Sequence, residues 1–198
     1  MKHERTKALY QYWDGVRGKR RAPRRLEIEP GAIAPLLPNV FILERVDPAT
    51  YRIRLAGTHL CGYCGHELRG RLFTSLWPEE EREAVRSLLH SVTEDAAGAV
   101  AGLEGREPQG RSASFELLLL PLATTQGVCE RVIGAISALD QPYWLGNWPI
   151  VAWNLKSTRI LWPDGTPPTY GEPAPVAYPP QFRGWLKVIE GGLSERTE

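Results

Sequence analysis

The sequence predicts an α+β fold in which one antiparallel sheet of five strands carries helices on one face. Two groups of strand-like segments indicate the sheet, because two lie before a helical stretch and three after it. Turn residues join neighbouring strands within each group, as in antiparallel hairpins. A doubly wound parallel sheet would need strands and helices to alternate along the chain, and here they do not.

The N-terminal 38 residues are predicted to form a helical flank. Leu9, Tyr12 and Trp13 recur at helical spacing. A second short helix is expected from Pro30, since proline is tolerated in a first helical turn, where its missing N–H is not needed. Pro38 ends this second helix.

A hairpin is expected next. The apolar run that starts at Val40 is typical of a buried strand, and Asp47–Thr50 has turn chemistry. Tyr51, Ile53 and Leu55 then alternate with arginines, which predicts a second strand with these three side chains on one face.

The clearest helix is predicted to start at Pro78. Three glutamates follow this proline, near the positive end of the helix dipole. We therefore interpret them as helix-start charges and not as catalytic carboxylates. The apolar stripe that faces the core follows the spacing i, i+3, i+4, i+7 and comprises Val85, Leu88, Leu89 and Val92.

Three more strands are expected, at residues 100–106, 115–120 and 132–139. The last two are joined by a turn at residues 124–127. After Asp140 the composition changes, because tryptophan and then proline become frequent.

This change divides the chain into three parts. Residues 1–38 are the N-terminal helical flank, residues 39–140 the sheet domain, and residues 141–198 a Trp/Pro-rich C-terminal extension. Within the extension, residues 150–155 have strand character and residues 182–189 helical character.

Composition narrows the class of protein. Lysine and arginine total 24 against 23 acidic residues, so no global charge selects nucleic acid or an anionic membrane. Three cysteines do not form a disulfide framework. Neither a bilayer-spanning apolar run nor the apolar segment of a signal peptide is visible, so we expect a cytoplasmic protein.

Short sequence motifs resemble those of a known family. Two strands, three helices and three strands follow one another in the order of PAS domains, and several strings resemble a bacterial, mostly alphaproteobacterial, PAS family formerly of unknown function. These strings are Tyr12-Trp13 with Gly18, Arg21, Pro23 and Arg24; Ile28–Ile33 with Leu36–Pro38; Tyr51–Thr58; and Gly65–Arg71.

The resemblance implies a PAS-like fold and a role in signalling. Such proteins bind a small apolar ligand or a protein partner, here an unidentified signalling protein. The family supplies neither a shared ligand nor a catalytic residue, so we expect no enzyme activity. Two chains are expected to pair through the helix that contains Tyr12 and Trp13.

In a PAS-like arrangement the concave face of the sheet and the short helices enclose an apolar space. This space is either a ligand pocket or a filled core, since both need the same residues. The candidates for its lining are Ile53, Leu55, Leu60, Cys64, Phe73, Leu76, Val85, Leu89, Phe115, Leu117 and Ile136.

Cys61 and Cys64 form a Cys-x-x-Cys pair with histidines nearby. A structural zinc site needs four ligands, and the sequence offers no second ligand pair. A c-type haem motif would need histidine directly after Cys64, where Gly65 stands. A redox dithiol stays an alternative, but we favour packing of the two residues in the core.

A basic run between residues 17 and 25 offers candidate anion-binding side chains. A nucleotide or nucleic-acid binder built on it is the alternative function, although no aromatic platform interleaves the arginines. We favour a solvated segment paired with Glu27 and Glu29, and expect neither nucleic acid nor a membrane as partner. The candidates are Arg20, Arg21, Arg24 and Arg25.

No cofactor is required by the sequence. His90 lies in the helix that starts at Pro78, where some PAS domains carry an axial haem ligand, but an exposed helical histidine is the more common case. We therefore expect neither haem nor zinc. No Ser/His/Asp order, phosphate-binding glycine loop or metalloprotease helix is present.

Overall fold

The computed structural model describes residues 1–163. The proline-rich segment beyond Pro163 and the helix expected at residues 182–189 lie outside the described residues.

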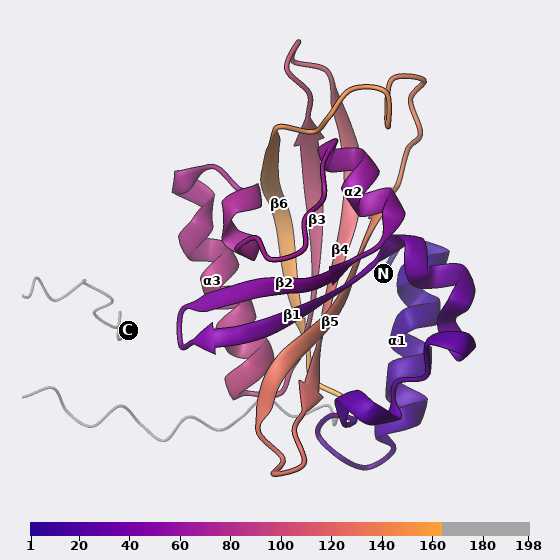
Figure 1. Ribbon diagram of the computed structural model, residues 1–198, viewed down its shortest axis with the longest axis vertical. Helices are drawn as coiled ribbons and strands as arrows, with labels where there is room; N and C mark the ends of the chain where they lie inside the picture. Colours follow the sequence, from indigo (N-terminus) through magenta and orange to yellow (C-terminus); the bar gives the residue numbers. More distant parts are fainter. Residues whose placement is uncertain (164–198) are drawn as a thin grey trace, which may run out of the picture. The chain divides into compact units, whose positions relative to one another are not determined.

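A single antiparallel sheet forms the centre of the described chain (Figure 1). Its strands stand in the order β2-β1-β5-β4-β3-β6. The predicted turn at residues 124–127 connects the two central strands, with the Thr124 N–H donating to the Val128 carbonyl at 2.8 Å. The strands are β1 (Val40–Asp47), β2 (Thr50–Ala56), β3 (Gly98–Arg106), β4 (Ser112–Ala123), β5 (Cys129–Ala138) and β6 (Ala152–Leu161).

Three α-helices and three 3-10 helices accompany the sheet within residues 1–163. The element order confirms the α+β class, with helices between the first two strands and the others. In the described chain no helix has the length and apolarity to cross a membrane. The helices are α1 (Glu4–Arg17), η1 (Arg25–Glu27), η2 (Pro30–Asn39), α2 (Thr58–Cys64), η3 (Phe73–Leu76) and α3 (Glu79–Glu94).

The sheet has six strands in the described chain, one more than the five predicted. The sixth is β6, which pairs with β3 along its whole length, from Gly98 opposite Leu161 to Arg106 opposite Ala152. The sequence shows strand character only over residues 150–155, because polar and charged residues fill the second half of β6. As an edge strand, β6 exposes these residues to solvent.

Helices lie on both faces of the sheet, where only one face was expected to be covered. Figure 1 shows α3 and α1 on opposite sides of the strands. The indole N–H of Trp13 in α1 donates to the carbonyl of Pro121 in β4 at 2.8 Å. The continuous apolar run of β4 agrees with this arrangement, because a strand buried on both faces needs no polar alternation.

Two apolar clusters result, one on each face. The inner cluster lies between the sheet and the helices α2, η3 and α3, and the outer cluster between the sheet and the N-terminal helices. Fully buried Leu9 and Trp13 anchor α1 in the outer cluster.

Candidate functional site

The inner cluster contains most of the predicted pocket-lining residues. Leu76 is half-buried and packs against the cluster, while Leu55 is 42% exposed and lies outside it. Buried members of the cluster are Ile53, Leu60, Cys64, Phe73, Val85, Leu89, Phe115, Leu117 and Ile136.

Leu55 leaves the inner face because the pairing of β1 and β2 contains a bulge. Ile42 stands opposite Leu55, but Leu43 stands opposite Ile53, so Arg54 is the extra residue. One extra residue reverses the alternation of faces. Tyr51 and Ile53 therefore face the core as expected, and Leu55 does not.

Aromatic side chains pack against one another in the inner cluster. The ring centroids of Phe41 and Phe73 are 5.1 Å apart, and those of Phe73 and Trp77 4.7 Å apart. Phe115 meets Trp153 edge-on at 4.8 Å. Phe41, Trp77 and Trp153 were not among the lining residues predicted from the sequence, although each stands in or beside a predicted element.

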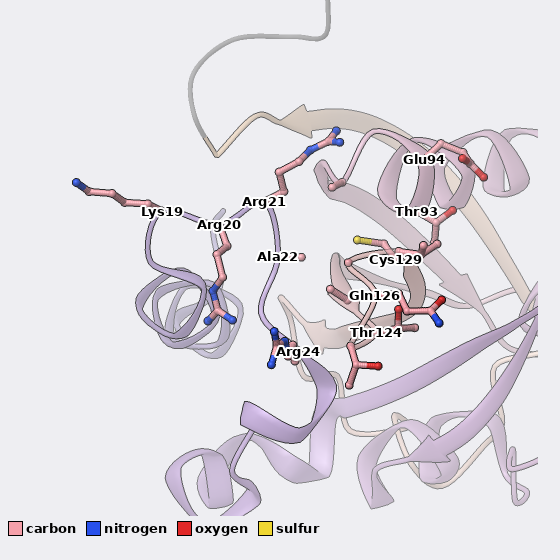
Figure 2. Close-up of a pocket in the computed structure, with 15 residues that line it drawn as sticks. Lys19, Arg20, Arg21, Ala22, Arg24, Thr93, Glu94, Thr124, Gln126 and Cys129 are labelled. Atoms are coloured by element: carbon pink, nitrogen blue, oxygen red, sulfur yellow. The ribbon is translucent and has the colours of Figure 1, made fainter.

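A cleft of about 690 Å³ lies where the segment after α1, the end of α3 and the β4–β5 turn meet (Figure 2). Three of the predicted anion-binding residues, Arg20, Arg21 and Arg24, line it. Its other walls include Thr93 and Glu94 of α3 and the turn residues 123–129. We call it the basic cleft.

A smaller cleft of about 370 Å³ adjoins the basic cleft. Both are lined by Arg24, Ala123, Thr124 and Thr125, so they lie on either side of the same turn. The fourth predicted residue, Arg25, lines the smaller cleft. The structure thus brings all four arginines to the β4–β5 turn, a proximity that was not predicted from the sequence.

Arg20 and Arg21 are held by contacts within the chain. Arg20 makes an ion pair with Glu27 at 2.8 Å, as expected from the sequence. The guanidinium of Arg21 donates to the carbonyl of Asp95 at the end of α3, at 2.6 Å. Figure 2 shows Lys19 pointing away from the cleft.

The cysteine pair has the chemistry of buried thiols. Burial raises the pKa of Cys64 to about 11, and burial followed by the nearby Glu67 carboxylate raises the pKa of Cys61. Both thiols are therefore protonated at neutral pH, which makes them poor nucleophiles and poor metal ligands. Within residues 1–163 no three His, Cys, Asp or Glu side chains form a group that could hold a metal ion.

His90 is exposed on α3 and lines an open groove with the β1–β2 turn. It therefore lies outside the inner cluster, where an axial ligand of an enclosed haem would be needed.

Comparison with known proteins identifies the fold family. A family model described as PAS domain matches residues 1–137, about two thirds of the chain. The match ends before β6. No curated protein sequence matches this chain.

Solved structures that match part of this chain include light-oxygen-voltage domains. A domain studied with a flavin analogue has 20% sequence identity and a TM-score of 0.44, over 57% of this chain and 85% of that one. The aureochrome1 domain in its light state has 18% identity and a TM-score of 0.43, over 56% of this chain and 90% of that one. The Rhodobacter sphaeroides protein has 13% identity and a TM-score of 0.43, over 53% and 61%.

Proposed function

Because this chain belongs to the PAS domain family, we propose that it is a non-catalytic signalling module that acts through contacts with a protein partner. In this proposal no separate ligand is held between the sheet and the inner helices.

The packing of the inner cluster is the observation that supports this proposal. Phe73 touches both Phe41 and Trp77, and Phe115 touches both Tyr63 and Trp153. Rings at such distances occupy the space that an enclosed apolar ligand would need, and interiors are packed nearly as densely as organic crystals. The chain's own side chains therefore take the place of a ligand.

The chemistry of the candidate nucleophiles agrees with a non-catalytic role. Cys64 is buried, and its pKa of about 11 keeps the thiol protonated. The partly buried Cys61 lies beside the Glu67 carboxylate, which disfavours a thiolate. Activated cysteines instead have cationic neighbours that lower their pKa.

Native mass spectrometry and an absorption spectrum of protein purified from its host test the proposal. We expect the mass of the polypeptide alone, or of an integral number of copies, and no absorption band in the visible region. A retained organic mass that is released on unfolding, a flavin or haem band, or a zinc ion would contradict a module that acts by protein contacts alone.

The predicted pairing of two chains through α1 stays a prediction. Trp13 is buried within its own chain, and the Tyr12 hydroxyl accepts a hydrogen bond from the Glu29 N–H at 2.8 Å. A dimer at this helix would therefore have to use its other side chains. The same mass spectra, recorded over a range of protein concentrations, test it.

A further inference from the structure

We propose that the basic cleft and the smaller cleft beside it bind a small phosphate-bearing ligand across the β4–β5 turn, with Arg24 and Arg25 as the contacting cations. This site is separate from the inner cluster, so the inference does not depend on how the proposed function turns out.

Arg24 and Arg25 differ from most arginines around them. Within residues 1–163 their side chains make no ion pair, although both residues line clefts. The two other arginines of the smaller cleft are already paired: Arg45 with Glu94, and Arg131 with Glu44. The charges of Arg24 and Arg25 are thus available to a ligand.

The backbone that carries these two arginines is held in place. The Ala123 N–H donates to the carbonyl of Pro23 at 2.9 Å, and Arg24 pairs in parallel with Ala123, the last residue of β4. On the other side, the Arg24 N–H donates to Glu27 at 2.7 Å, and Arg20 binds both oxygens of the same carboxylate. A segment fixed in this way loses little backbone entropy when a ligand binds.

The turn adds donors that suit an anion with several oxygens. Thr124 and Thr125 line both clefts, and the buried hydroxyl of Thr124 has no hydrogen-bond partner within residues 1–163. Among the backbone contacts of residues 1–163, the N–H groups of Thr125 and Gln126 have no carbonyl partner. Phosphate oxygens accept hydrogen bonds from hydroxyls, backbone N–H groups and arginine forks together, as in other phosphate sites.

Charge and size favour this class of ligand over others. Three arginines and one acidic residue line the basic cleft beside Lys19, whose side chain points away (Figure 2), and four basic and two acidic residues line the smaller cleft. Volumes of about 690 and 370 Å³ lie in the range of small-molecule sites. Neither lining contains an aromatic residue on which the bases of a nucleic acid could stack.

Titration calorimetry with inorganic pyrophosphate on the full chain tests the inference. We expect binding at an ionic strength of about 20 mM that weakens when salt is added, because salt screens exposed charges. The double variant R24A/R25A should bind at least about tenfold more weakly, and R24K/R25K should lie between it and the wild type, since lysine keeps the charge but loses the fork.

The double variant R69A/R71A is the matched control. It removes the same number of charges from two exposed arginines that line neither cleft. Its affinity should stay within about twofold of the wild type, because a specific contact and not the net charge holds the anion. Circular dichroism checks that all variants are folded.

Three results would overturn the inference: no pyrophosphate binding by the wild type, equal affinities of wild type and R24A/R25A, or an equally large loss in the control. Tighter binding of an acidic peptide than of pyrophosphate would assign the clefts to a protein partner instead. Orthophosphate and ADP, measured in the same way, identify the source of the phosphate. Higher affinity for ADP than for pyrophosphate indicates a nucleotide, and equal affinity for the two indicates an inorganic or headgroup anion.

Discussion

Cys64 shows how burial decides chemistry at the scale of one residue. Its spacing from Cys61 is that of a redox or metal pair, but its side chain lies in the inner cluster. Desolvation raises its pKa to about 11, and a contact with the Trp153 indole offsets only part of this. The same two residues would be reactive in an electropositive, open setting.

Alkylation by iodoacetamide at pH 8 should therefore distinguish the three thiols. We expect half-buried Cys61 to react first, and Cys64 to react at least about tenfold more slowly, because both its burial and its raised pKa suppress the thiolate. Buried Cys129 is the internal reference, and unfolding in urea should equalise all three rates. Rapid and equal reaction of Cys61 and Cys64 in the folded protein would instead support the redox alternative.

At the scale of one element, the packing around β6 depends on a glycine in the neighbouring strand β3. Gly105 of β3 stands opposite Trp153 of β6. A Cβ atom at Gly105 would lie 2.8 Å from the Phe115 ring and 3.1 Å from Ile150. The glycine thus lets Phe115 and Ile150 close over β3, and Phe115 in turn packs on Trp153.

Replacement of Gly105 by alanine should destabilise the protein by about 1–3 kcal/mol, since the added methyl group overpacks the core. The matched control is G62A in α2, where a Cβ would meet nothing within 4 Å. G62A should stabilise the protein by up to about 1 kcal/mol, because alanine favours a helix over glycine. Urea unfolding measures both, and a G105A variant as stable as the wild type would show that β6 does not depend on this close packing.

At the scale of the whole molecule, one ionic contact fastens the segment that leads from β5 to β6. Arg111 lies over the rings of Tyr143, Trp144 and Trp148, the last at 4.7 Å. Its guanidinium donates to the buried carboxylate of Glu107 at 3.0 Å. This segment brings β6 to the far edge of the sheet.

The stability of the protein should depend on the ionisation of Glu107. The hydrogen bond from Arg111, followed by those from two backbone N–H groups, holds its pKa at about 2. Because the folded pKa lies below the unfolded value of about 4.3, the contribution is present above that pH and is lost as the pH falls towards 2.

Urea unfolding at several pH values tests this. E107Q should be less stable than the wild type at pH 7, and the difference should shrink as the pH falls from about 4 towards about 2. E79Q is the control, because Glu79 is exposed at the start of α3. A difference between E107Q and the wild type that stays constant with pH would rule out an ionic role for Glu107.

Much of the fold was predictable because its signals are local. The i, i+3, i+4, i+7 stripe identified α3, and alternation with arginines identified β2 up to Ile53. Leu55 was placed wrongly because the bulge at Arg54 arises from pairing with β1, which no pattern within β2 reveals. Strand β6 was only partly detected, since an edge strand needs no apolar alternation over its full length.

The arginines of the candidate anion site were predictable from the sequence, but their pairing was not. The run from Arg17 to Arg25 indicated which cations are close in sequence, but not which of them are paired. Arg20 is paired with Glu27 as expected, whereas Arg24 and Arg25 stay without an ion pair within residues 1–163.

By itself the sequence determined the α+β class, the order of the first five strands and the resemblance to PAS domains, because periodicity and turn residues act over a few neighbouring positions. Only the tertiary structure decided that helices cover both faces, that β6 joins at β3, and that the β4–β5 turn meets the arginines. These features depend on contacts between residues far apart in the sequence, such as Arg106 with Ala152, Arg24 with Ala123, and Trp13 with Pro121. Such contacts are chosen by packing and pairing of the whole chain and leave no periodic trace in any one segment.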